Sequence, residues 1–137
     1  MQQLIHVLIV EDSKYCADLN VRELKRGGFD VHWSRVESEE AMLLAMEDGK
    51  WDIILSDNST PRFNAVQALG VRNRTNPKMP FIIVSEDVSP ASIKYAMQQG
   101  CCAYLLKENL HQLAILVKNI LAREPKQEEK LAHGLHQ

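Results

Sequence analysis

The sequence lacks the features of membrane, secreted and polyanion-binding proteins. No apolar run approaches the roughly twenty residues that cross a bilayer. The start of the chain has no basic segment, and its first apolar run leads directly into the acidic pair Glu11 and Asp12 rather than a cleavage site. The 16 Lys and Arg against 18 Asp and Glu give a net charge of −2, with no basic excess for nucleic acid. We therefore expect a cytoplasmic protein that binds neither a membrane nor nucleic acid directly.

Cysteine is scarce and unsuitably spaced for cross-linking. The chain has three cysteines, and two of them, Cys101 and Cys102, are adjacent. This excludes a disulfide framework and a zinc site built from spaced pairs, so we interpret the cysteines as small buried side chains in a reducing compartment. The five histidines show no spacing that builds a metal site with a carboxylate, and we interpret them as surface or structural residues.

What is present is an alternation of short apolar runs with segments of helical spacing. The runs predict strands over residues 4–10, 30–36, 53–55, 81–84 and 104–106, of which the second alternates like an exposed edge strand. This alternation in one short chain predicts an α/β fold with three layers around a doubly wound, five-stranded parallel sheet. The apolar positions of the five expected helices are Ala17, Val21 and Leu24; Ala41, Leu44 and Ala45; Val66 and Leu69; Ile93, Ala96 and Met97; and Leu110, Leu113, Val117, Ile120 and Leu121.

The domain is expected to occupy residues 1–123. Glu124 and Pro125 end the last helical pattern, and residues 124–137 read as a charged tail or linker. Because the first strand begins at the N-terminus, we expect no sensor domain before it. An output domain absent from this chain is a possible continuation of the tail.

Charged and polar side chains follow four of the expected strands. Glu11 and Asp12 follow the first, and Asp57, Ser85 and Lys107 follow the third, fourth and fifth. The carboxyl ends of parallel strands form one edge, where such sheets bind ligands. Three carboxylates there repel one another, which raises at least one pKa unless a divalent cation binds. Oxygen ligands suit Mg²⁺, and a lysine beside them equips the site for phosphoryl transfer with Asp57 as nucleophile.

With these residues at the strand ends, the sequence resembles a response-regulator receiver domain of two-component signalling over about residues 4–123. The resemblance implies a flavodoxin-like fold with strand order 2-1-3-4-5. Each motif is weak alone, but together, in order and at strand ends, they are specific. The matching residues are Glu11 and Asp12, Asp57 with Pro61 four residues later, Ser85, and Tyr104, Leu105, Leu106 and Lys107.

The resemblance assigns a role to each of these residues. Asp57 would take a phosphoryl group from a phosphohistidine of a sensor histidine kinase or phosphotransfer domain and form an aspartyl phosphate. Mg²⁺ would be bound by Asp12, Asp57 and the backbone carbonyl of Ser59, with Glu11 acting through a water. Lys107 would pair with the phosphoryl oxygens. Such a protein is a signalling switch within a phosphorelay and not a turnover enzyme.

The resemblance also implies a switch. The hydroxyl of Ser85 would move toward the phosphoryl group, and Tyr104 would change rotamer into the vacated space. The face made by the fourth helix, fifth strand and fifth helix would then change, and partners would bind it. For Ser85 the alternative is a turn cap, and for Tyr104 it is a packed strand residue whose hydroxyl reaches water.

Two glutamates depart from the family pattern. Glu86, next to Ser85, stands where a small residue is usual and could hinder the tyrosine or repel a phosphoryl group. Glu108 stands where a proline in a cis peptide is usual, and we predict a trans bond after Lys107 because a cis non-proline bond costs about 2.5–4 kcal/mol. Ser59 and Asp87 correspond to family positions that tune the lifetime of the phosphoryl group.

Three other functions compete with the receiver. A flavodoxin-like cofactor protein needs a phosphate cradle after the first strand, where Glu11 and Asp12 would repel phosphate. An aspartate-nucleophile phosphohydrolase places its nucleophile after the first strand as Asp-x-Asp, and this chain is too short for its substrate cap. A pseudo-receiver, an interaction module with degraded chemistry, is kept open by Glu86 and Glu108.

Overall fold

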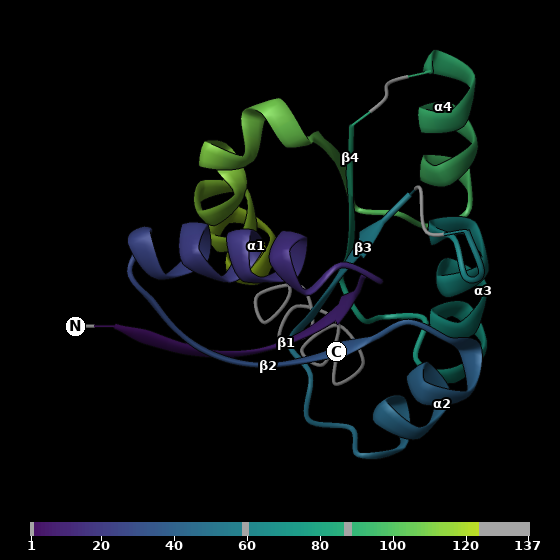
Figure 1. Cartoon of the computed structure of the whole chain (residues 1–137), viewed down its shortest axis with the longest axis horizontal. Helices are drawn as coiled ribbons and strands as arrows, with labels where there is room; N and C mark the ends of the chain where they lie inside the picture. The colour runs from purple at the N-terminus through teal and green to yellow at the C-terminus, as the bar shows by residue number, and fades with distance from the viewer. Residues whose placement is uncertain (1, 59–60, 87–88, 124–137) are drawn as a thin grey trace, which may run out of the picture.

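The computed structural model describes residues 2–58, 61–86 and 89–123 and contains one parallel sheet between two layers of helices (Figure 1). The strand order β2-β1-β3-β4-β5 and the parallel pairing confirm the predicted fold. The elements are β1 (Gln3–Val10), α1 (Lys14–Arg26), β2 (Phe29–Val36), α2 (Glu39–Glu47), β3 (Ile53–Asp57), α3 (Ala65–Thr75), β4 (Phe81–Ser85), α4 (Pro90–Gln98), β5 (Ala103–Leu106), the 3₁₀ helix η1 (Lys107–Gln112) and a helix over residues 113–123.

The sheet separates two hydrophobic cores. Helix α1 and the helix over residues 113–123 cover one face, and α2, α3 and α4 cover the other (Figure 1). Successive side chains of a strand point to opposite faces, so Val7 and Ile9 of β1 lie in the first core, whereas Leu8 and Val10 lie in the second. Burial on both faces is why this strand is a nearly unbroken apolar run in the sequence, interrupted only by His6 between Leu4 and Val10.

The expected helix faces are partly wrong. Leu44, Val66 and Met97 were expected to face the core, yet they are 66%, 40% and 45% exposed. Met42 and Ala68 are fully buried in α2 and α3. These helices have only 9 to 11 residues and carry apolar residues on more than one side, so spacing alone does not identify the buried face.

The segment after β5 also differs from expectation. A continuous helix from Leu110 was expected, but η1 comes first, and its Asn109 has non-helical angles (φ −105°, ψ 22°). The Lys107–Glu108 peptide is trans, as predicted, since no cis bond occurs among the described residues. Within the described part of the chain, no helix is long and apolar enough to cross a membrane.

Two consecutive glycines end α1 for different reasons. Gly28 has a φ of 100°, the left-handed conformation expected after a helix. Gly27 has a φ of −80°, but a Cβ there would lie 2.1 Å from the Cβ of Ala114. Gly27 therefore allows α1 to approach the last helix, a contact between segments far apart in the sequence.

Candidate functional site

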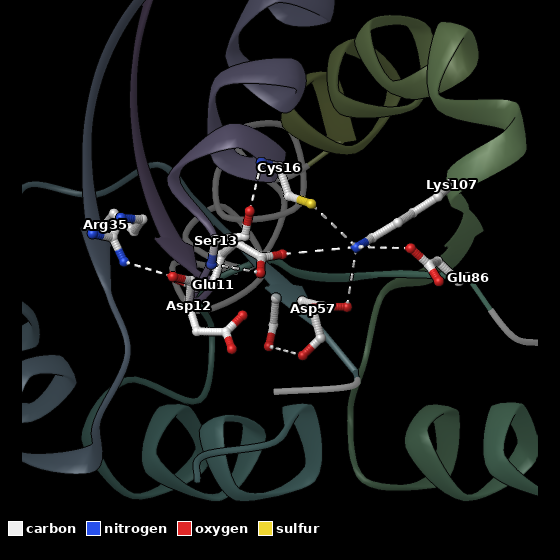
Figure 2. A network of polar contacts seen from close by, with 9 residues as sticks. Glu11, Asp12, Ser13, Cys16, Arg35, Asp57, Glu86 and Lys107 are labelled. Atoms are coloured by element: carbon white, nitrogen blue, oxygen red, sulfur yellow. Dashed lines mark hydrogen bonds and ion pairs between the residues drawn. The ribbon is translucent and has the colours of Figure 1, made fainter. Parts of the chain in front are cut away.

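Four of the predicted site residues, Glu11, Asp12, Asp57 and Lys107, lie together at the carboxyl edge of the sheet (Figure 2). Glu11 directly follows β1, Asp57 is the last residue of β3, and Lys107 directly follows β5. Carboxylate oxygens of Glu11, Asp12 and Asp57 lie within 4.8 Å of one another. The neighbouring strands β1, β3 and β4 are hydrogen-bonded in register, and this pairing brings residues 46 positions apart in the sequence into one acidic cluster.

Two of these three carboxylates are buried. Glu11 is 2% exposed and Asp57 is 6% exposed, whereas Asp12 faces solvent. Burial raises the pKa of Glu11 to about 7, and the neighbouring carboxyl groups of Asp12 and Asp57 act in the same direction. The backbone N–H of Ser13, which donates to Glu11 at 3.0 Å, partly offsets this. Burial and the neighbouring carboxyl groups both disfavour the charged form of Glu11, so the cluster favours a proton or a cation.

The ammonium group of Lys107 lies at the centre of the charged groups (Figure 2). Its Nζ is 3.6 Å from Asp57 Oδ1, 3.9 Å from Glu11 Oε2 and 4.0 Å from Glu86 Oε1. Burial by itself lowers the pKa of Lys107, but the carboxylates of Asp57 and Glu11 together with Cys16 and Glu86 raise it above its ordinary value. Lys107 is therefore a permanent cation that partly neutralises the cluster.

Ser85 and Tyr104 lie in the fourth and fifth strands, and their role as switch residues stays a prediction. Ser85 is buried at the end of β4, the strand next to Asp57. The hydroxyl of Tyr104 accepts a hydrogen bond from Asn58 Nδ2 at 3.0 Å. Tyr104 also borders a cavity of about 260 Å³ beside α4. The tyrosine is thus joined to the residue that follows Asp57, and its change of rotamer stays a prediction.

Two residues near the site, Cys16 and Arg35, were not assigned a role there from the sequence. Cys16 Sγ lies 3.7 Å from Lys107 Nζ, so it is not a buried hydrophobic side chain; Cys102 is exposed, and only Cys101 is buried as expected. Arg35 donates to the backbone carbonyls of Glu11 and Asp12. Only its place near the end of an edge strand could have indicated this. Ser59 and Asp87 lie outside the described residues.

The donor set fits Mg²⁺. Mg²⁺ prefers hard oxygen ligands and is usually held by one or two carboxylates together with waters and phosphate oxygens. Glu11, Asp12 and Asp57 supply carboxylates that converge on one point. The pKa of Glu11 is raised mainly by burial and further by the neighbouring carboxyl groups, and a divalent cation there would counter both effects.

Comparison with known proteins identifies the family to which the sequence is similar. Residues 7–118 match the family of the response regulator receiver domain. The sensor kinase CckA of Brucella abortus (strain 2308) is 29% identical over 86% of this chain and 13% of its own length. The transcriptional regulatory protein DcuR of Escherichia coli (strain K12) is 29% identical over 76% of this chain and 44% of its own length. The chain thus spans less than half the length of these curated relatives.

Solved structures share the fold. A CheY-like response regulator receiver domain protein of Methanospirillum hungatei JF-1 has a TM-score of 0.77 at 23% identity, covering 91% of this chain and 99% of its own. The signal receiver domain of a Luxo repressor protein from Vibrio parahaemolyticus has a TM-score of 0.78 at 24% identity, covering 93% and 96%. With the family match over residues 7–118, the chain belongs to the response regulator receiver domain family.

Proposed function

We propose that the chain is a phosphoacceptor receiver whose Asp57 takes a phosphoryl group from a phosphohistidine. The observation that carries this proposal is the convergence of three carboxylates and Lys107 at the carboxyl edge of the sheet. A carboxylate nucleophile beside a lysine and a cation site is the equipment for phosphoryl transfer. Asp57 is the proposed acceptor because it is the carboxylate nearest to the Lys107 ammonium in the buried centre of the cluster.

In the proposed step, an oxygen of Asp57 forms a bond to phosphorus while the bond from phosphorus to the histidine nitrogen breaks. The imidazole leaves with the electron pair of that bond, and the product on this chain is an aspartyl phosphate. Lys107 and the hydroxyl of Ser85 bind the phosphoryl oxygens. Asp12 and Asp57 would hold Mg²⁺ directly and Glu11 through a water, and the family pattern adds the backbone carbonyl of Ser59, which lies outside the described residues. When bound, Mg²⁺ would supply positive charge against the charge of the transferred group.

The proposed donor is a sensor histidine kinase or a phosphotransfer domain in the cytoplasm. Most charged groups described at the site are carboxylates, which repel the phosphoryl group of a donor. Bound Mg²⁺ would reduce this repulsion and let the donor approach Asp57. Movement of Ser85 toward the phosphoryl group and of Tyr104 into the space beside α4 would then change the surface of α4, β5 and the last helix. That surface is proposed to bind the next component, such as an output domain.

The test is the intact mass of the full chain after incubation with a small acyl phosphate and then with a phosphorylated phosphotransfer domain. We expect one phosphoryl group to be added in the presence of Mg²⁺ and none in excess chelator. Hydroxylamine should remove it, because hydroxylamine cleaves acyl phosphates and leaves phosphate esters of serine intact. If neither donor gives an adduct, the pseudo-receiver is the better description.

Glu86 is expected to slow the reaction. Its carboxylate is 4.0 Å from Lys107 Nζ and its side chain is 73% exposed, so it competes with phosphoryl oxygens for the ammonium and repels an anionic donor. Glu86→Ala should increase the initial rate of adduct formation by about two- to five-fold at low salt, the range of a solvent-exposed charge pair. The increase should shrink as salt screens the charge.

A matched control for this variant is Glu108→Ala. Glu108 is exposed and directly follows Lys107 in the sequence, so the same charge is removed nearby. An equal increase in both variants would show that net charge rather than the contact with Lys107 is responsible.

A further inference from the structure

Glu11 and Asp12, the acidic segment after β1, lie where the sheet ends, so their backbone carbonyls need hydrogen-bond donors from outside the sheet. The pairing of β1 with β2 ends at Val10 and Val36, and the N–H of Glu11 still donates to the carbonyl of Val36 at 3.0 Å. Beyond this point β2 gives way to the start of α2. Backbone carbonyls near the end of a strand must find donors elsewhere, in side chains or water.

Arg35 supplies such a donor. Its Nη1 donates to the carbonyl of Glu11 at 3.1 Å and to the carbonyl of Asp12 at 3.3 Å (Figure 2). Arg35 belongs to β2, so a side chain of the edge strand reaches over the end of β1. The same Nη1 lies 3.4 Å from Glu37 Oε2, and this ion pair is a further contact that holds the guanidinium near the end of β1.

The acidic segment is held on a second side by α1. Ser13 is the N-cap of that helix, its hydroxyl accepts from the N–H of Cys16 at 3.2 Å, and its own N–H donates to Glu11 Oε1 at 3.0 Å. Arg35 and the helix cap therefore fix consecutive peptide groups from Glu11 to Ser13. The directions of the Glu11 and Asp12 side chains relative to Asp57 depend on those peptide groups.

We propose that Arg35 is a positioning residue for the cation site, one that orients Glu11 and Asp12 through their backbone carbonyls without touching the cation. This inference deepens the proposed function and rests on it. Arginine suits the role because its planar group presents several N–H donors in a fixed geometry, whereas lysine offers a point charge on a flexible stem. Residues that orient metal ligands typically contribute about 10- to 100-fold to metal affinity.

Charge and position predict opposite effects of removing Arg35. Arg35 is a cation close to a cation site, so electrostatics alone predicts that Arg35→Ala binds Mg²⁺ more tightly. Positioning predicts weaker binding, because the carboxylates of Glu11 and Asp12 lose their fixed orientation. The sign of the change in the dissociation constant therefore distinguishes the two roles.

The experiment is a calorimetric titration of the full, unphosphorylated chain with Mg²⁺, with the unfolding free energy of each variant measured in chelator. We expect Arg35→Ala to raise the Mg²⁺ dissociation constant about ten-fold, and Arg35→Lys to recover only part of the loss. Arg26→Ala is the matched control. Arg26 pairs with Glu23 near the C-terminal end of α1, whereas the site lies beside the N-terminal end of that helix. It should leave the dissociation constant unchanged.

Each outcome bears on one proposal. If the native chain binds no Mg²⁺, the proposed function fails. If the native chain binds Mg²⁺ and Arg35→Ala binds it equally or more tightly, the positioning role of Arg35 is refuted while the function stands. A variant that only loses stability in chelator, with an unchanged dissociation constant, assigns Arg35 a purely structural role and also refutes the inference.

Discussion

Replacing Asp57 with asparagine is expected to abolish the phosphoryl adduct completely. Asparagine keeps the shape of the side chain but has no anionic oxygen to form the acyl phosphate. Asp57 is buried beside Glu11, and its proximity is one of the causes that raise the pKa of Glu11, so the substitution also removes repulsion. The variant should therefore fold, and a thermal unfolding curve in chelator checks this. The readout is intact mass with both donors in the presence of Mg²⁺.

Asp52→Asn is the control for this variant. Asp52 lies immediately before β3, at the opposite end of the strand from Asp57, and its carboxylate accepts from the N–H of His6 at 2.8 Å. We expect this variant to be phosphorylated like the native chain. An adduct of unchanged yield on Asp57→Asn would contradict the assignment and direct the search to Asp12.

Replacing Lys107 with methionine is expected to have the largest effect on stability. Lys107 is the cation that lies between Asp57, Glu11 and Glu86, and its own side chain is only 22% exposed. Removing one partner of a buried ion pair costs about 3–5 kcal/mol. Because Lys107 keeps some contact with solvent, we expect a loss of about 2–3 kcal/mol in the free energy of unfolding, measured with denaturant in chelator at pH 8.

Added Mg²⁺ should restore much of this loss. A cation bound among the carboxylates replaces the missing positive charge, so saturating Mg²⁺ should stabilise Lys107→Met more than it stabilises the native chain. Lys94→Met, in the exposed part of α4, is the control and should change stability by less than about 0.5 kcal/mol. If Mg²⁺ stabilised Lys107→Met and the native chain equally, the role of Lys107 as the neutralising charge would be contradicted.

Much of the site follows from the sequence because parallel strands impose a common edge. Once the apolar runs are read as strands, their carboxyl ends must meet, so Asp57, Ser85 and Lys107 are expected near Glu11 and Asp12 without any knowledge of their distances. The structure describes the same residues at that edge and gives the distances between them. The burial of β1 on both faces was equally predictable, since a strand covered on both sides is a nearly continuous apolar run.

Contacts between side chains of distant segments were not predictable. Arg35 bonds the carbonyls of Glu11 and Asp12 from 24 and 23 residues away, and no spacing rule connects an arginine of an edge strand with them. Cys16 meets Lys107 across 91 residues. The buried side of the short helices was also undetermined, because a few apolar residues in two or three turns fit more than one face.

The sequence by itself determined the order of strands and helices, the common edge and the chemical groups that line it, because hydrophobic periodicity and strand polarity are local properties that a chain carries along its length. Only the tertiary structure decided which group touches which. The raised pKa of Glu11, the central place of Lys107 and the bonds from Arg35 depend on burial and on distances of a few ångströms. Those distances arise when the helices pack on the sheet and the side chains find their partners.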